Sequence, residues 1–252
     1  MKVKNKIISS IWINLLNNLS QHGIDFWIDY GTLLGYVRNN KIISWDKDID
    51  ISIKYEDYKK LLNFLGNDNN NKYKIVFQKR YPYLDSLVQI HPGPSIVKDN
   101  IFPMHLDIYL YKKLDNYYLL RYLQTPYGSL KKLSKIINKI IKRIYASNNA
   151  ILSESIKIFI LDLLLKLLCS YSYCGYEVIP KKYFYDFKEI NFFGIKVKIP
   201  LNEKEYLEFL YGNNWRKPIK NWNWKKSGSY KIMPASVLKE PSIIFFKNKI
   251  KN

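Results

Sequence analysis

Three aspartates at alternate positions are the residues of this sequence best suited to chemistry. Asp46, Asp48 and Asp50 follow a glycine turn at Gly31 and an arginine, Arg38. Because residues i and i+2 of a strand project from the same face, Asp48 and Asp50 are expected to point the same way. Two ionised carboxylates so placed repel each other unless a cation lies between them. Such oxygen ligands suit Mg²⁺ or Mn²⁺, and these ions suit phosphate chemistry.

The residues around these aspartates show the alternation of a half-buried strand. Apolar residues alternate with polar ones, namely Ile49, Ile51 and Ile53 with Asp48, Asp50 and Ser52. The pattern predicts a strand with its acids on the open face. A solvated acidic turn is the competing interpretation, and it is disfavoured because like charges on one strand face are destabilising.

A fourth aspartate lies on another predicted strand, at residues 105–111. Asp107 stands between Leu106 and Ile108, in an alternating segment. It is a candidate third metal ligand. The alternative is a charge at the edge of a strand, or a partner for one of the many lysines.

The remaining elements follow from apolar periodicity and from glycine and proline punctuation. A helix that starts near Thr32 is expected to turn its N-terminus towards the glycine turn. Strands are predicted at residues 25–29, 49–53, 74–78, 86–91 and 105–111, with a short pair within 190–199. Helices are predicted at residues 4–20, 32–37, 55–65, 129–146, 153–171 and 203–211.

Length and composition indicate a folded chain. The 252 residues fit one large domain or a core with a helical extension, and 47% hydrophobic with 25% charged residues excludes disorder. The formal net charge of +20 attracts polyanions such as nucleic acid, anionic lipid or acidic polysaccharide. Abundant Lys, Asn, Ile and Tyr are equally typical of AT-rich coding DNA, so both interpretations of the charge stay open.

The predicted helix at 129–146 has one basic and one apolar face. Its basic face is expected to meet an anionic partner, either an acidic glycan or a membrane surface. The basic residues are Lys131, Lys132, Lys135, Lys139, Lys142 and Arg143, and the apolar ones are Leu130, Leu133, Ile136, Ile137, Ile140, Ile141 and Ile144.

Other features bear on location and metals. Two cysteines, Cys169 and Cys174, indicate free thiols in a reducing compartment. Three histidines are too few and too dispersed to predict a histidine-based metal centre. Residues 7–19 favour an amphipathic helix over a signal peptide, and residues 156–169 carry charges and are short for a membrane span. We expect a cytoplasmic protein that can touch a membrane surface peripherally.

The motifs together resemble the LicD/fukutin family of phosphotransferases, which have a nucleotidyltransferase-type core. The N-terminal signature is matched by residues 29–35, by Arg38 and by residues 43–50, with Ser44 where the family usually has Pro. Asp107-Ile108-Tyr109 matches a downstream strand. The C-terminal signature is matched by residues 193–195, 199–200, 206–207 and 211–215 and by Pro218, so the matches run from about residue 25 to 220.

The resemblance implies an α+β fold, with a nucleotidyltransferase-like mixed β-sheet core, flanking helices and a helical C-terminal extension. Residues 1–115 would form the catalytic core, and residues 116–252 a helical, LicD-type region packed with it as one unit. It also implies transfer of a phospho-alcohol, such as phosphocholine or phosphoribitol, from a CDP-activated donor to a sugar hydroxyl of a glycan or glycoconjugate.

Two other classes of function stay open. One is a nucleotidyltransferase that acts on RNA or protein with a nucleoside triphosphate, although nucleic acid is the less expected partner. The other is a non-enzymatic polyanion-binding protein on a degenerate core, which the intact aspartates argue against because unused clustered carboxylates cost stability.

Roles for individual residues follow from the resemblance. Asp48, Asp50 and Asp107 would hold Mg²⁺ or Mn²⁺ on the donor pyrophosphate, and Asp107 or Asp46 would accept the acceptor's proton. Arg38 would clamp a phosphate oxygen, or instead form a salt bridge to Asp46. The expected substrate-binding residues are Tyr30, Gly31, Thr32, Gly35 and Arg38. The segment from Tyr211 to Pro218 is expected to pack rather than to catalyse.

Overall fold

The computed structural model describes residues 8–66, 72–77, 87–94, 101–127 and 173–234, together with nine isolated positions between 136 and 164, all of them helical. The chain divides into two compact units. The first comprises residues 1–78, 86–120 and 178–230, and the second comprises residues 79–85, 121–177 and 231–252. Every element that carries the candidate site belongs to the first unit.

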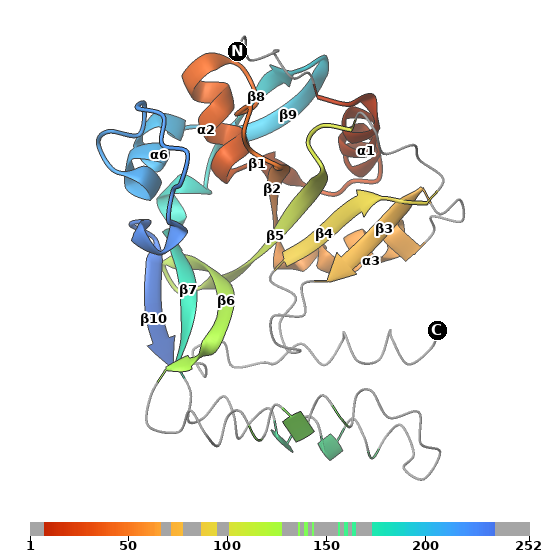
Figure 1. Ribbon diagram of the computed structural model, residues 1–252, viewed down its shortest axis with the longest axis vertical. Helices are drawn as coiled ribbons and strands as arrows, with labels where there is room; N and C mark the ends of the chain where they lie inside the picture. Colours follow the sequence, from red (N-terminus) through yellow and green to blue (C-terminus); the bar gives the residue numbers. More distant parts are fainter. Residues whose placement is uncertain are drawn as a thin grey trace. The chain divides into compact units, whose positions relative to one another are not determined.

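A mixed sheet of ten strands forms the framework, in the order β10-β7-β6-β5-β2-β1-β9-β8, with β4 on β5 and β3 on β4 (Figure 1). Strands β2 (Asp48–Lys54) and β5 (His105–Leu114) run parallel, whereas β1 (Phe26–Ile28) is antiparallel to β2. The other strands are β3 (Tyr73–Phe77), β4 (Leu87–Pro92), β6 (Tyr117–Tyr127), β7 (Tyr173–Pro180), β8 (Phe187–Phe192), β9 (Ile195–Pro200) and β10 (Tyr230–Pro234).

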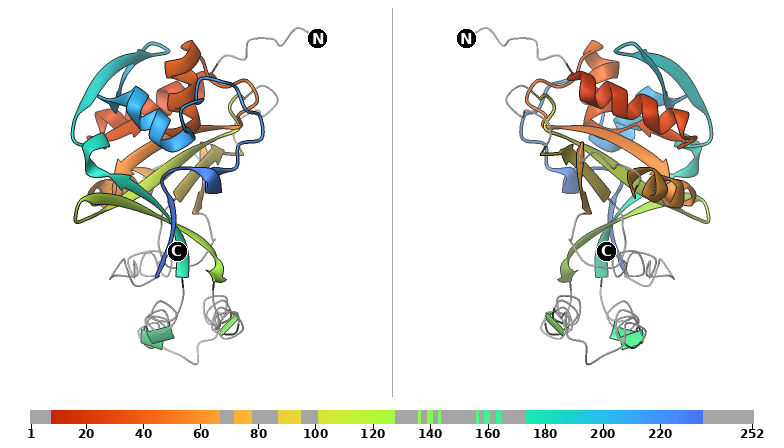
Figure 2. Two further views of the ribbon diagram at one scale, coloured as in Figure 1. Left: turned by 90° about the vertical axis from the view of Figure 1, so that its left-hand side faces the viewer. Right: turned by 90° about the vertical axis from the view of Figure 1, so that its right-hand side faces the viewer.

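Helices cover both faces of the sheet in the first unit. Helices α2 (Tyr30–Asn39) and α6 (Glu203–Tyr211) lie on one face, and α1 (Ser10–Gln21) and α3 (Tyr58–Gly66) lie on the other (Figure 2). Short 3₁₀ turns occupy Tyr55–Asp57, Lys181–Tyr183 and Trp224–Lys226. Among the described residues, no helix is long and apolar enough to cross a membrane.

The core is built from the buried face of each element. The fully buried Trp12, Leu15 and Leu16 of α1 pack under the sheet, and Ile49, Ile51 and Ile53 of β2 are completely buried. A cluster of aromatic rings, formed by Trp27, Tyr111, Phe184, Phe187 and Tyr206, fills the other side. Burial of this apolar surface supplies the main driving force for folding.

The predicted α+β class, with a mixed sheet and flanking helices, is confirmed. The predicted helix at 203–211 and the strand pairs at 74–78 with 86–91 and within 190–199 are present. Strands β6, β7 and β10 were not predicted, because their stabilising partners lie far away in the sequence and strand propensity depends on that context. The predicted helices at 129–146 and 153–171 fall outside the described residues apart from the isolated positions, and the boundary at residue 115 stays a prediction.

A buried carboxylate joins three of these elements beside the sheet. Asp29, which is fully buried at the end of β1, accepts hydrogen bonds from the amide of Tyr30 (2.8 Å), the hydroxyl of Ser52 (2.6 Å) and the hydroxyl of Tyr206 (2.9 Å). Burial raises the pKa of the Asp29 carboxyl, and these hydrogen bonds oppose that rise. Asp29 therefore fixes the β1–α2 turn to β2 and to the distant helix α6.

We predict that Tyr206→Phe destabilises the fold, because it removes one donor from a buried carboxylate. The expected loss is about 1–3 kcal/mol of unfolding free energy, measured by urea denaturation. Tyr183→Phe is the matched control, since its ring lies 5.3 Å from that of Tyr206 but its hydroxyl meets the exposed side chain of Glu205 at 3.4 Å. Equal losses in the two variants would contradict the role given to Asp29.

Candidate active site

Four aspartates and one histidine meet on one face of the sheet in the first unit. One carboxylate oxygen from each of Asp46, Asp48 and Asp50 lies within 4.8 Å of the others, and the same holds for ligand atoms of Asp48, His105 and Asp107. Asp48 belongs to both groups. The structure thus brings together the four aspartates that the sequence pattern singled out.

The parallel pairing of β2 and β5 produces this convergence. In the register of the two strands, Asp48 lies beside His105 and Asp50 lies beside Asp107. Because alternate residues share a face, all four side chains emerge on the same side of the sheet. Asp46 joins them from the loop that precedes β2, where its backbone amide donates to the carbonyl of Ile43.

The start of helix α2 holds Asp50. The amide of Thr32 donates to Oδ2 of Asp50 at 3.2 Å, and the amide of Asp50 donates to Oγ1 of Thr32 at 2.8 Å. A helix N-terminus stabilises negative charge, so this contact suits a carboxylate. Thr32, an expected substrate-binding residue, thus positions a carboxylate, and its contact with substrate stays a prediction.

Glycine at position 31 is required by the closeness of two carboxylates. A Cβ atom at Gly31 would overlap Oδ2 of Asp46 and would lie 3.0 Å from Oδ2 of Asp50. Any side chain here would push the aspartates apart. The glycine of the predicted turn thus serves the spacing of the acidic cluster.

Tyrosines and a glutamine support the cluster from neighbouring positions. The hydroxyl of Tyr109 donates to Oδ1 of Asp50 at 3.2 Å, and Nε2 of Gln89 donates to Oδ1 of Asp107 at 2.9 Å. The ring of Tyr30 packs against that of Tyr109 at 4.6 Å, and its hydroxyl hydrogen-bonds to that of Tyr111. Tyr30 thus stands at the rim of the cluster.

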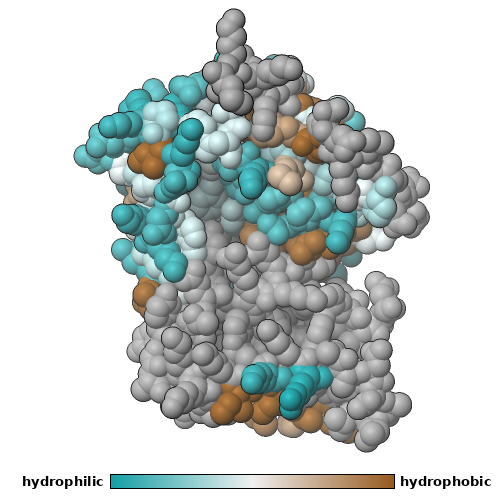
Figure 3. Space-filling view, viewed as in Figure 1, coloured by the Kyte–Doolittle hydropathy of each residue, from teal (hydrophilic) through white to brown (hydrophobic). Residues whose placement is uncertain are grey.

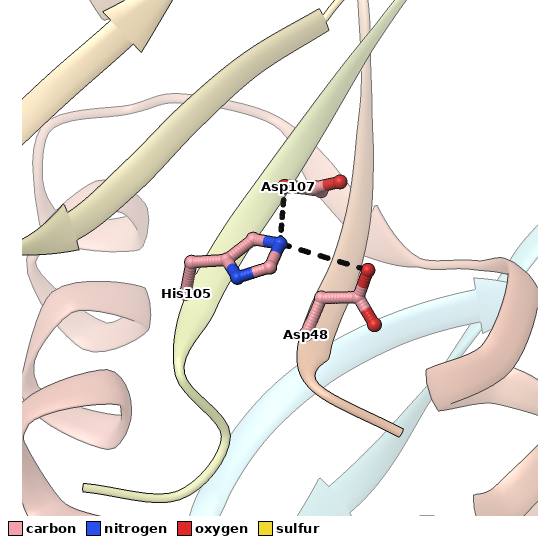
Figure 4. A group of neighbouring side chains, drawn as sticks. All are labelled: Asp48, His105 and Asp107. Atoms are coloured by element: carbon pink, nitrogen blue, oxygen red, sulfur yellow. Dashed lines mark ion pairs between the residues drawn. The ribbon is translucent and has the colours of Figure 1, made fainter. Parts of the chain in front are cut away.

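His105 is a member of the cluster that the sequence pattern did not single out. Its Nε2 lies 3.4 Å from Oδ1 of Asp107 and 3.7 Å from Oδ2 of Asp48 (Figure 4). The ring of His91 stacks on it at 5.0 Å. The period of two around Asp107 could have revealed both His105 and Tyr109, whereas Gln89 comes from another strand and carries no such signal.

Burial, together with the crowding of negative charge, changes the protonation of the cluster. Burial, followed by the charges of Asp48, Asp46 and Asp107, raises the pKa of Asp50 well above its ordinary value. Burial and a hydrogen bond to Asp48 raise the pKa of Asp46 to about 8. Burial lowers the pKa of His105, and the charge of Asp48 opposes this shift. The cluster therefore holds protons at neutral pH that a metal ion would displace.

Gly35 and Arg38 lie further along α2. A Cβ atom at Gly35 would lie 2.6 Å from the carbonyl oxygen of Lys41, so this glycine allows the loop after α2 to pack closely. Nε of Arg38 is buried, and burial lowers the pKa of the guanidinium. Within the described part of the chain, no ion pair joins Arg38 to Asp46, which was one of its two predicted roles; contact with substrate stays a prediction for both residues.

Comparison with known proteins finds a match for the segment that carries this site. Residues 23–122 match the family model described as LicD/FKTN/FKRP, nucleotidyltransferase domain. Relatives named "Ribitol-5-phosphate transferase FKTN" from Macaca fascicularis and Homo sapiens are 26% and 25% identical over 209 residues, which is 83% of this chain. The chain spans about a third of the length of these curated relatives, 33% in each case.

A solved structure shows a weaker similarity to this chain. The crystal structure of ANT(2″)-Ia in complex with adenylyl-2″-tobramycin is 13% identical and covers 63% of this chain and 88% of its own, with a TM-score of 0.30. The matched family segment, in contrast, includes the glycine turn, β2 with its aspartates, and β5 with Asp107. Residues 23–122 are thus similar to the LicD/FKTN/FKRP nucleotidyltransferase domain, the family that the motifs of the chain resemble.

Proposed function

We propose that this chain transfers a phospho-alcohol, of the phosphocholine or phosphoribitol kind, from a CDP-activated donor to a sugar hydroxyl of a glycan. The convergence of Asp46, Asp48, Asp50 and Asp107 within a LicD-type domain is the observation that carries the proposal. Relatives named as ribitol-5-phosphate transferases support the class of reaction.

The donor set fits a divalent metal ion. Asp48, Asp50 and Asp107 offer carboxylate oxygens, the ligands that Mg²⁺ and Mn²⁺ prefer, and Asp48 belongs to both groups of possible ligand atoms. Burial, followed by the neighbouring carboxylates, raises the pKa of Asp50, and burial with a hydrogen bond to Asp48 raises that of Asp46. A bound ion would neutralise charge on the pyrophosphate and polarise the phosphoryl group.

Each residue of the cluster then has a separate task. Asp48, Asp50 and Asp107 hold the ion, and Thr32 and Tyr109 keep Asp50 in place. Asp46 comes from a loop rather than a strand, and it lies next to the carboxylates of Asp48 and Asp50 without being one of the three proposed metal ligands. Asp46 is therefore the proposed acceptor of the proton from the sugar hydroxyl.

The donor class is tested by thermal shift and by mass spectrometry of transfer products. We expect CDP-ribitol or CDP-choline to raise the melting temperature in the presence of Mg²⁺, and the shift to vanish on chelation. Transfer of the alcohol phosphate to a sugar, with release of CMP, would follow. Stabilisation by ATP or GTP alone, with nucleotide attached to RNA or protein, would replace this proposal with the nucleotidyltransferase alternative.

Asp50→Asn is predicted to abolish transfer and to stabilise the metal-free protein. The folded-state pKa values of Asp46 and Asp50 lie above the ordinary 3.8, so the folded state binds more protons than the unfolded state. Stability of the metal-free protein should therefore fall as pH rises from about 5 to 8.5. In Asp50→Asn, stability should fall less steeply with pH. The melting temperature of each metal-free protein, measured across this pH range, checks this.

Asp115→Asn is the matched control for Asp50→Asn. Asp115 is exposed in the β5–β6 turn with φ +44°, a backbone conformation that asparagine also adopts, so activity and the pH profile should stay unchanged. Undiminished transfer by Asp50→Asn, or the same pH profile in that variant as in the native protein, would contradict the proposed role.

An anionic surface is the proposed partner of the basic helix. Four described positions fall at helical spacing on one exposed face, with Ile136 and Ile140 54% and 40% exposed beside Lys139 and Arg143. Hydrophilic and hydrophobic surface adjoin at the lower edge of the space-filling view (Figure 3). This mixture suits a helix that rests on an anionic membrane. The other predicted lysines of this helix lie outside the described residues.

The double variant Lys139→Gln and Arg143→Gln should weaken sedimentation with vesicles that contain phosphatidylglycerol. The native interaction should also weaken with salt, because the Debye length falls from about 10 Å at 0.1 M to about 3 Å at 1 M. The control is the double variant Lys196→Gln and Lys217→Gln, which changes two exposed lysines of the first unit. Equal binding by all three proteins would mean that these charges are generic surface residues.

A further inference from the structure

His105 stands where a metal ligand would stand. Its Nε2 faces Oδ2 of Asp48 and Oδ1 of Asp107 (Figure 4), at 3.7 Å and 3.4 Å respectively. Both distances exceed the usual 2.7–3.2 Å of an N–H···O hydrogen bond. Ligands that each lie about 2.1 Å from one ion are about 3.0–3.5 Å apart, which is close to the separations seen here.

The surroundings hold this histidine and its neighbours in place. His105 lies beside Asp48 in the β2–β5 register, so the backbone of two paired strands sets their separation. The ring of His91 stacks on His105 at 5.0 Å with an interplanar angle of 29°. Gln89 donates to the Asp107 oxygen that faces the histidine. Outer contacts of this kind orient the ligands of metal sites.

The two groups of ligand atoms differ in chemistry. Asp46, Asp48 and Asp50 offer oxygen alone, whereas the group that contains His105 offers one nitrogen and two oxygens. Mg²⁺ favours oxygen ligands in octahedral geometry. Imidazole suits Zn, Cu, Fe and Ni, and Mn²⁺ is the transition-metal ion among those that carboxylates suit, so it fits a mixed set of one nitrogen and two oxygens better than Mg²⁺ does. A nitrogen ligand should therefore shift the preference of this position away from Mg²⁺.

We propose that Nε2 of His105 ligates a divalent ion together with Asp48 and Asp107, and that this position favours Mn²⁺ over Mg²⁺. The inference rests on the proposed function in so far as both treat the aspartate cluster as a metal centre. It adds the nitrogen ligand and the choice of ion, which set the metal with which the enzyme works.

Mn²⁺ bound to the metal-free, tagless full chain provides the test. Pulsed electron paramagnetic resonance detects coupling between Mn²⁺ and a directly bound imidazole nitrogen. The chain has three histidines, so the double variant His22→Gln and His91→Gln leaves His105 alone. We expect nitrogen coupling in the native protein and in the double variant, and loss of the coupling in His105→Gln.

Competition between the two ions gives a second measurement. His105→Asp restores an all-oxygen ligand set, and we expect it to lower the preference for Mn²⁺ over Mg²⁺ about tenfold, comparable to losses seen when metal-site partners are removed. Circular dichroism in chelator checks that each variant folds. If substitution of His105 prevents folding, the double variant His22→Gln and His91→Gln still tests the proposal, because its only histidine is His105 and its nitrogen coupling can be measured.

The outcomes separate this inference from the proposed function. Mn²⁺ binding without nitrogen coupling in the native protein, or coupling that persists in His105→Gln, would overturn the role of His105 but leave the phosphotransferase proposal in place. Nitrogen coupling in a protein that fails to use CDP-alcohols would support the role of His105 and refute the donor class. Failure to bind either ion would refute both.

Discussion

The parallel register of β2 and β5 is the constraint on which the site depends. It sets Asp48 beside His105 and Asp50 beside Asp107, so four side chains that could ligate a metal ion share one patch without help from any loop. A slip of one residue would turn each of them to the opposite face. The buried Ile49, Ile51 and Ile53, together with Leu106, Ile108 and Leu110, prevent that slip because they would then be exposed.

The same register concentrates negative charge, and the surrounding elements limit its cost. Helix α2 turns its first amides to Asp50, and Gly31 leaves room for Asp46 and Asp50 to approach. Asp29 then fixes the start of α2 to Ser52 and to Tyr206 of α6. The C-terminal segment thereby supports the site through a hydrogen bond to a buried carboxylate, which explains how a motif so late in the sequence belongs to it.

Local pattern was enough to predict the strand of Asp48 and Asp50, a helix that begins near Thr32 and the strand of Asp107, although Gly31 lies within the first turn of that helix and not in a turn before it. Period-two alternation and glycine placement record these features directly. It was not enough for the contacts that cross the sheet. Gln89 of β4 donates to Asp107 of β5, and the pairing of these strands depends on packing that no local stretch of sequence contains. The contact between Thr32 of helix α2 and Asp50 of β2 likewise joins two elements that are separate in the sequence. His105 was missed although its spacing from Asp107 matched the strand period.

Calorimetric titration of the metal-free protein with Mg²⁺ and Mn²⁺, in buffers of different ionisation enthalpy near pH 7, tests the central claim most directly. The raised pKa values of Asp46 and Asp50 mean that the metal-free cluster carries protons at this pH. A metal ion must displace them, so the account predicts saturable binding with proton release that grows smaller above about pH 8. Absence of binding, or binding without proton release, would contradict it.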